Sequence, residues 1–176
     1  MTRRLVFIGG IHGVGKTQFA DLLAKRYGAQ HVIASDLIRT RKSLPVHKNV
    51  DDVKANQDLL VLALSGLERT SDILLLDGHY CLLSSLCKVE EIPLHTFRQL
   101  APTALIVISD KIDVIRNRLR ERDGSNFNRA LIKNFQNSEI EHAKKVSVEL
   151  GVCLEHVVAP GPSEVDDLRW KALFRG

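Results

Sequence analysis

Residues 10–17 read Gly-Ile-His-Gly-Val-Gly-Lys-Thr and satisfy the pattern GxxxxGK[ST]. The pattern follows an apolar run, Leu5–Ile8, and opens a segment, Lys16–Tyr27, whose apolar residues recur with helical spacing. Glycines at this spacing let the backbone turn so tightly that successive N–H groups converge on one anion, at φ values and distances that a Cβ would obstruct. We therefore expect a strand, a tight loop and a helix in succession, with the loop binding the phosphates of a nucleotide.

The residues of this loop have separate predicted contacts. The helix that begins near Gly15 adds its N-terminal dipole to the loop amides. Lys16 can reach the β- and γ-phosphates of ATP, and the Thr17 hydroxyl is placed to ligate Mg²⁺. We interpret His12 as a variable position of the loop rather than a catalyst. The predicted ATP-binding residues are Gly10, Ile11, His12, Gly13, Val14, Gly15, Lys16, Thr17 and Gln18.

Short apolar runs alternate with helical segments along the rest of the chain. The runs are rich in Leu and β-branched residues, and they lie at Leu5–Ile8, His31–Ala34, Ile73–Leu76, Ala104–Ile108 and Val152–Val158. Helices are expected at Lys16–Tyr27, Val53–Leu67 after a cap at Asp51 and Asp52, Ile112–Arg122, Leu131–Leu150, and from Ser163 through Trp170 to Phe174. This alternation predicts an α/β fold of three layers, with a doubly wound, parallel, five-stranded sheet between helices.

Composition narrows the class of protein. The 176 residues are enough for one domain with a sizeable core, and no linker rich in Pro, Gly or Ser divides them, so we expect a single domain over residues 1–176. The longest apolar runs, such as Leu59–Leu64, fall far short of the ~18 residues that a membrane span needs. The first apolar run is also shorter than the roughly 7–15 residues of a signal peptide. We therefore predict a cytoplasmic protein with no membrane partner.

Charge and cysteine content indicate little about partners. A formal net charge of +4 favours an anionic partner, but a small polyphosphate accounts for it as well as nucleic acid does. Nucleic acid is thus compatible with the sequence but not indicated by it. Cys81, Cys87 and Cys153 are odd in number and contain no CxxC pair, so neither a disulfide framework nor a zinc site is predicted. We expect three reduced, buried thiols.

Asp77 follows the apolar run Ile73–Leu76, at the expected end of a strand. In doubly wound sheets, ligands bind beyond the carboxyl ends of the strands. A Mg²⁺ ion held by a hydroxyl and phosphates usually also takes a carboxylate from a neighbouring strand. We therefore predict Asp77 as a magnesium ligand, a role compatible with its forming a turn ahead of Gly78.

Three further segments, together with the loop, resemble nucleoside monophosphate kinases of the adenylate kinase type over most of the chain. "IASDLIR" (33–39) is similar to the family's segment after the second strand, Asp77-Gly78 is similar to the Asp-Gly that ends its third strand, and "DVIRNRLRERD" (113–123) is similar to the helix that leads into its lid. The resemblance implies a P-loop kinase fold with a lid. It also implies that Asp36 helps to order Mg²⁺ and that Arg39 binds the acceptor phosphate.

Arg118 and Arg122 match the arginines, spaced by four, that reach the transferred phosphoryl group in that family. Residues i and i+4 share one helix face, so both guanidinium groups can point at the same anion. With Lys16 and Asp77 they form the predicted catalytic set. Arg116 and Arg120 lie on a different face, where we expect them to be exposed. A basic, solvent-exposed helix is the alternative interpretation of all four arginines.

The sequence departs from the family on the acceptor side. Typical adenylate kinases continue the Asp-Gly with Phe-Pro-Arg, whereas this chain has His79-Tyr80-Cys81, so one acceptor-binding arginine is missing. The predicted lid, about 123–129, is short and lacks the family's Arg-x-Asp-Asp pattern, although Arg129 could take a related role. Residues 81–93 have no counterpart. His79 is either an acceptor contact or proton relay, or a histidine bonded to the backbone.

These observations predict an ATP- and Mg²⁺-dependent phosphotransferase. An acceptor-binding segment is expected over about 35–70, and the predicted acceptor-binding residues are Ser35, Asp36, Arg39 and His79. The resemblance favours a nucleoside monophosphate as acceptor. The missing arginine and residues 81–93 favour a nucleoside, another small metabolite or a polynucleotide end. A third interpretation is an ATPase switch or assembly factor that acts on a macromolecular partner.

Overall fold

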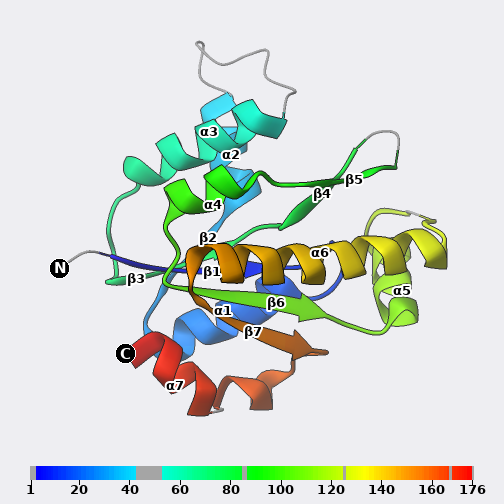
Figure 1. The fold of residues 1–176 in the computed structure, drawn as a ribbon. Coiled ribbons are helices and arrows are strands. Elements are labelled where there is room, and N and C mark those ends of the chain that lie inside the picture. Colours follow the sequence, from blue (N-terminus) through cyan, green and yellow to red (C-terminus); the bar gives the residue numbers. More distant parts are fainter. Residues whose placement is uncertain (1–2, 43–52, 85–86, 125, 167, 176) are drawn as a thin grey trace.

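A five-stranded sheet forms the centre of the computed structural model, which describes residues 3–42, 53–84, 87–124, 126–166 and 168–175. Its strands run in the order β2-β3-β1-β6-β7, and all neighbouring pairs are parallel (Figure 1). Their bounds are β1 Arg4–Gly9, β2 Gln30–Ile33, β3 Ile73–Asp77, β6 Ala104–Ser109 and β7 Cys153–Val158. The predicted doubly wound α/β fold is confirmed.

Helices cover both faces of the sheet (Figure 1). One face carries α1 (Lys16–Tyr27) and α7 (Leu168–Arg175). A 3-10 turn, η1 (Pro162–Asp166), precedes α7. The other face carries α3 (Val53–Ser65), α4 (Leu94–Leu100) and α6 (Arg129–Leu150). The remaining helices are α2 (Ala34–Lys42), which packs beside α3, and α5 (Ile112–Asp123).

Alternation along the strands produces a separate apolar core on each face. Because successive side chains of a strand point to opposite faces, the central strands β1, β3 and β6 each contribute to both cores. In β1, Val6 and Ile8 belong to the core that contains α1 and α7, whereas Leu5 and Phe7 belong to the core under α3, α4 and α6. The apolar runs of β1, β3 and β6 are therefore buried on both sides, whereas the edge strands β2 and β7 are only partly buried.

A hairpin lies within residues 81–93, where the sequence has no counterpart in adenylate kinases. Strands β4 (Cys81–Leu83) and β5 (Val89–Glu91) pair antiparallel and pack against α6. Each has three residues, which is too few for alternation to be recognised. The short helices α2 and α4 are likewise absent from the predicted elements.

Several predicted boundaries are shifted. Ala34 begins α2 instead of ending β2, because β3 ends at Asp77, opposite Ile33, and offers no further pairing partner. Helix α6 begins two residues earlier than expected because Asn128 caps it, and its side chain accepts a hydrogen bond from Leu131 N at 2.7 Å. Strand β7 begins one residue later than expected, and the last helix is divided into η1 and α7. The predicted cap at residues 51 and 52 lies outside the described residues.

The cysteine expectation is wrong for two of the three residues. All three are free thiols, but only Cys81 is buried. Cys87 lies between the two strands of the hairpin, and Cys153 begins the edge strand β7, so both side chains face solvent. Within the described ranges, none of the helices has the length and apolar character that a membrane span requires.

Candidate active site

The glycine-rich loop leaves β1 at the carboxyl edge of the sheet and leads into α1. Gly10 has φ +148°, and a Cβ there would lie 2.6 Å from the carbonyl oxygen of Ile108. At Gly13, φ is +80° and a Cβ would lie 3.0 Å from Leu119 Cγ. Gly15 is the N-cap of α1 and has no side chain to cap the first amides of that helix. These amides are therefore available to an anion.

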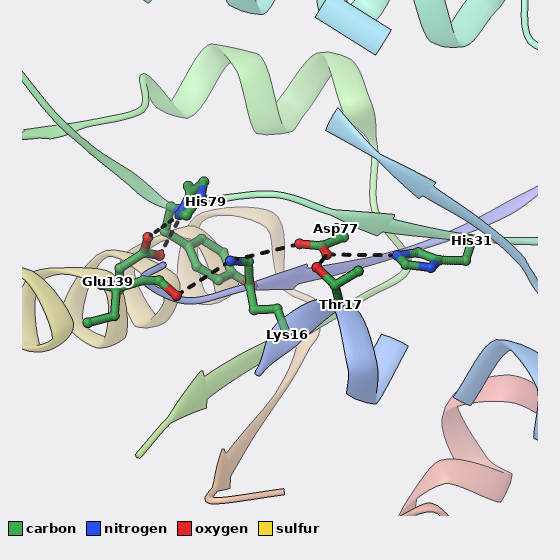
Figure 2. Close-up of polar contacts among 8 residues, drawn as sticks. Lys16, Thr17, His31, Asp77, His79 and Glu139 are labelled. Atoms are coloured by element: carbon green, nitrogen blue, oxygen red, sulfur yellow. Dashed lines mark hydrogen bonds and ion pairs between the residues drawn. The ribbon is translucent and has the colours of Figure 1, made fainter. Parts of the chain in front are cut away.

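Asp77 lies beside this loop because β1 and β3 are neighbours, with Ile8 opposite Asp77. The Thr17 hydroxyl donates a hydrogen bond to Asp77 Oδ2 at 2.7 Å, and Lys16 Nζ lies 3.9 Å from Asp77 Oδ1 (Figure 2). The side chains of Lys16 and Asp77 are 8% and 3% exposed. The three residues expected to contact phosphates and metal are thus brought together.

The surroundings of Asp77 and Lys16 shift the pKa values of both side chains. Burial by itself raises the pKa of Asp77, but the nearby His31 ring, the charge of Lys16 and the hydrogen bond from Thr17 hold that pKa below its ordinary value. Burial lowers the pKa of Lys16, against the opposing charges of Asp77 and Glu139. Asp77 is therefore an ionised carboxylate at neutral pH.

The oxygens of Thr17 and Asp77 fit a magnesium ion. A hydroxyl oxygen and an ionised carboxylate are hard ligands, and Mg²⁺ typically takes only one or two protein oxygens together with phosphates and water. Among the described residues, no three or more His, Cys, Asp or Glu side chains gather into a site that could hold a metal by themselves. A site completed by nucleotide phosphates is consistent with this arrangement.

His31, on β2, is a site residue that the sequence analysis does not identify. Its Nδ1 lies 2.7 Å from Asp21 Oδ1, and its Nε2 lies 3.8 Å from Asp77 Oδ2. Burial opposes the charged form, but the two carboxylates together raise the pKa of His31. The contact with Asp77 requires β2 and β3 to be neighbours, and strand order cannot be obtained from periodicity.

Glu139, on α6, is a second residue that sequence reasoning missed. Its carboxylate is fully buried, with Oε1 3.1 Å from His79 Nδ1 and Oε2 accepting a hydrogen bond from Tyr80 N at 2.8 Å (Figure 2). The sequence left open whether His79 bonds a backbone group. In the structure, its ring contacts the carboxylate of Glu139 instead. The only sequence signal for Glu139 is that a charged residue stands on the apolar face of the predicted helix.

The rings of His12 and His79 lie together, with centroids 4.4 Å apart. Burial, followed by the charges of His79, Lys16 and Arg122, lowers the pKa of His12 to about 3. His12 is therefore neutral at physiological pH and contributes a polar ring rather than a cation to the site.

The two predicted catalytic arginines lie at the loop. Arg118 Nη1 donates to Asp110 Oδ2 at 2.8 Å and to the carbonyl oxygens of Gly13 and Val14 at 3.2 and 3.4 Å. Arg122 lines a hollow beside the same loop. Arg118 therefore contacts the loop carbonyls from one side, as a positioning residue would.

The other arginines of this region differ from expectation in part. Arg120 is exposed, as predicted, but Arg116 is half-buried, and its guanidinium donates to Asn126 Oδ1 at 3.5 Å. Asn126 follows α5 and lies close enough to cover Arg116, which helical spacing alone does not reveal. Arg129 forms an exposed ion pair with Asp113 on α5.

The predicted acceptor-binding residues are not brought together. Ser35 and His79 line one cavity, whereas Asp36 and Arg39 do not line it. Arg39 instead forms an ion pair with Asp36 at 2.9 Å, and the two side chains are 77% and 51% exposed.

Two cavities meet at the loop. The outer cavity, about 500 Å³, is lined by His12, Gly13, Gly15, Lys16, Thr17, Gln18, Arg118, Glu121 and Arg122. The inner cavity, about 200 Å³, is lined by Asp77, Gly78, His79 and mainly apolar residues of the sheet, α2, α3 and α4. His12, Lys16 and Thr17 line both cavities, so ligands in the two would meet at these side chains.

Comparison with known proteins agrees with this architecture. A family model described as an AAA domain matches residues 9–134, which is most of the chain. The chain belongs to this AAA domain family. This AAA domain protein is similar in structure to a gluconokinase from Sinorhizobium meliloti 1021, with a TM-score of 0.52 and 15% identity over 98% of this chain and 94% of that chain. A search of curated proteins finds no match.

At this level of identity, the structural likeness concerns the fold alone. It confirms the predicted P-loop kinase type of α/β fold for the AAA domain protein. The finer resemblance to adenylate kinases stays a prediction, as do the roles of individual site residues.

Proposed function

We propose that this protein is an ATP- and Mg²⁺-dependent phosphotransferase that moves the γ-phosphoryl group of ATP to a small-molecule acceptor. The observation that carries the proposal is the meeting of the outer and inner cavities at His12, Lys16 and Thr17. A donor in one cavity and an acceptor in the other would have their reacting groups at the same side chains. Phosphoryl transfer depends on positioning and charge stabilisation, so no nucleophilic side chain is required.

On the donor side, the loop residues 10–17 and the first amides of α1 would bind the phosphates of ATP. Thr17 and Asp77 would hold Mg²⁺, which neutralises charge on the β- and γ-phosphates when bound. Lys16 would exchange its contact with Asp77 for the transferred phosphoryl group. Arg118 supports the loop through its carbonyl groups, and Arg122 provides a cation at the outer cavity.

A nucleoside monophosphate is the acceptor that the resemblance to adenylate kinases implies. Its phosphate would need Arg39, and Asp36 would need to lie near the metal. In the structure these two residues pair with each other and line neither cavity. This observation favours the other small acceptors, and the similar gluconokinase is by name a kinase of a different acceptor.

The proposal is tested by measuring ADP formation from Mg·ATP with and without pools of small molecules. We expect ADP formation to rise with one pool and to be matched by an equal amount of phosphorylated acceptor. A different result would contradict the proposal: no small molecule accelerates ADP formation, but RNA, DNA or a protein partner does. That result would favour the ATPase switch instead.

A further inference from the structure

The inner cavity is small and has mainly apolar walls. Phe7, Leu60, Ile92, Phe97 and Leu100 line it, and each of these side chains is buried. Its volume of about 200 Å³ lies below the roughly 300–1,000 Å³ typical of pockets for drug-sized ligands. The cavity therefore fits a small molecule with an apolar body, and it fits no more than the end of a polymer.

Positive charge is scarce in this cavity. Among the described side chains, Lys16 is the only lysine or arginine that lines the cavity. The negative charges of Asp77 and Glu139 partly neutralise its positive charge. A phosphate monoester carries about two negative charges near neutral pH. Burying such a group requires several paired cations or charge-assisted hydrogen bonds. The described lining does not offer them, so this part of the cavity favours an uncharged acceptor over a phosphorylated one.

Neutral polar groups are present instead. Thr96, the third residue of α4, is fully buried, and its Oγ1 has no hydrogen-bond partner in the part of the chain that the structure describes. Gln57, on α3, is 5% exposed and lines the same cavity. Buried polar groups normally have a partner in the protein, in water or in a ligand. A hydroxyl and a carboxamide can each donate to and accept from an uncharged polar group.

We propose that the inner cavity binds an uncharged, non-phosphorylated alcohol as the phosphoryl acceptor. The inference rests on the proposed function and specifies its substrate class. The apolar body of the acceptor lies among Phe7, Phe97 and Leu100, and a polar group of the acceptor bonds Thr96 and Gln57. Its reactive hydroxyl lies at the end of the cavity lined by Lys16 and Thr17, next to the outer cavity.

The transfer step balances without a further reactant. The hydroxyl oxygen of the acceptor forms a bond to the γ-phosphorus of ATP, and the bond from that phosphorus to the bridging oxygen breaks. Its electron pair stays on ADP, and the hydroxyl proton is released to solvent. The products are ADP and the phosphate monoester of the alcohol, which carries charge that the inner cavity is poorly suited to retain.

The substrate class is tested with two pools and γ-labelled ATP. One pool contains uncharged alcohols (nucleosides, neutral sugars, polyols and aromatic alcohols), and the other contains nucleoside monophosphates, sugar phosphates and aldonic acids. We expect label to enter only compounds of the first pool. Transfer to the anionic pool would overturn the inference but leave the proposed phosphotransferase intact. Transfer to neither pool would overturn both.

A substitution at Thr96 tests the predicted contact. Thr96→Val keeps the shape of the side chain and removes its hydroxyl, so we expect the KM of the active alcohol to rise by about tenfold. The affinity for Mg·ATP should stay unchanged. Because the lost hydroxyl has no partner among the described residues, Tm should rise or stay equal, which separates a lost ligand contact from damage to the fold.

Thr96→Ser and Thr103→Val complete the test. Serine retains the hydroxyl and should keep the KM near the wild-type value. The Thr103 hydroxyl donates to Leu5 O at 3.1 Å and lies outside both cavities. Thr103→Val should lower Tm and leave the KM unchanged. An unaltered KM in Thr96→Val would contradict the proposed contact.

Discussion

At the scale of single residues, the site combines side chains whose roles depend on what they touch. Lys16 is buried against Asp77 and lines both cavities, so it is the residue through which donor and acceptor would meet. Glu139 is buried and lines neither cavity. It contacts the site through its hydrogen bonds with His79 Nδ1 and Tyr80 N. The first residue is expected to affect chemistry and the second to affect position.

Lys16→Ala should reduce phosphoryl transfer from Mg·ATP by at least ~10²–10³ with every acceptor, because it removes the cation nearest the reacting phosphate. Steady-state ADP formation measures the effect. Lys25, on the exposed side of the same helix, supplies the control: Lys25→Ala should keep wild-type turnover. Near-normal turnover in Lys16→Ala would remove the donor assignment.

Glu139→Gln should lower the free energy of unfolding by about 1–3 kcal/mol, because the amide cannot accept both hydrogen bonds that the carboxylate accepts. Urea denaturation measures this loss. Glu141 lies on the same helix but is 64% exposed and pairs with the exposed Lys144. Glu141→Gln should change stability by less than ~0.5 kcal/mol. Equal effects of the two substitutions would show that the buried contacts contribute little.

At the scale of elements, the loop between β1 and α1 is held by its neighbours as well as by its own glycines. The carbonyl of Ile108 on β6 limits the space at Gly10, and Arg118 on α5 donates to the carbonyls of Gly13 and Val14. The loop conformation therefore depends on a strand and a helix that come about a hundred residues later in the chain.

Gly10→Ala should destabilise the protein by about 1–3 kcal/mol and weaken Mg·ATP binding, because the added methyl group meets a backbone oxygen at a strained φ. Denaturation curves and calorimetric titration measure the two effects. Gly151 also has a positive φ, +64°, but a Cβ there meets nothing within 4 Å. Gly151→Ala should cost about 1 kcal/mol and keep nucleotide affinity. Equal nucleotide affinities in the two variants would argue against the crowding at Gly10.

At the scale of the whole molecule, the sheet separates the two proposed ligands. The donor loop leads into α1, which packs on one face, and the inner cavity lies under α3 and α4 on the other face. Ligands on both sides meet at the carboxyl edge of β1 and β3, which is where doubly wound sheets bind ligands.

Binding at this edge should stabilise the entire fold. Mg·ATP at about 100 times its Kd should raise the free energy of unfolding by about 2.7 kcal/mol. Asp77→Asn should reduce this gain with Mg·ATP and leave the smaller gain with metal-free ATP largely unchanged, as thermal unfolding would show. Asp72→Asn, at a carboxylate that is 78% exposed and pairs with Arg69, should behave as the wild type. An identical magnesium effect in Asp77→Asn would contradict the metal assignment.

Local pattern was sufficient for the fold class and for the donor side. The glycine spacing of residues 10–17, the apolar runs and the position of Asp77 after Leu76 are contiguous signals. Steric limits and burial act on them within a few residues. The parallel sheet and the loop follow from these signals and are present in the structure. The contact of Thr17 with Asp77 also requires β3 to lie beside β1.

Only the tertiary structure decided the acceptor side. Glu139 meets His79 across 60 residues of chain, Thr96 and Gln57 are buried and line one cavity, and Arg39 does not line the cavity that Ser35 lines. Each of these depends on strand order and on which face of a helix packs against the sheet. Such contacts join distant parts of the chain, so the sequence by itself determined the fold class and predicted a phosphate site, whereas packing determined which side chains lie around that site.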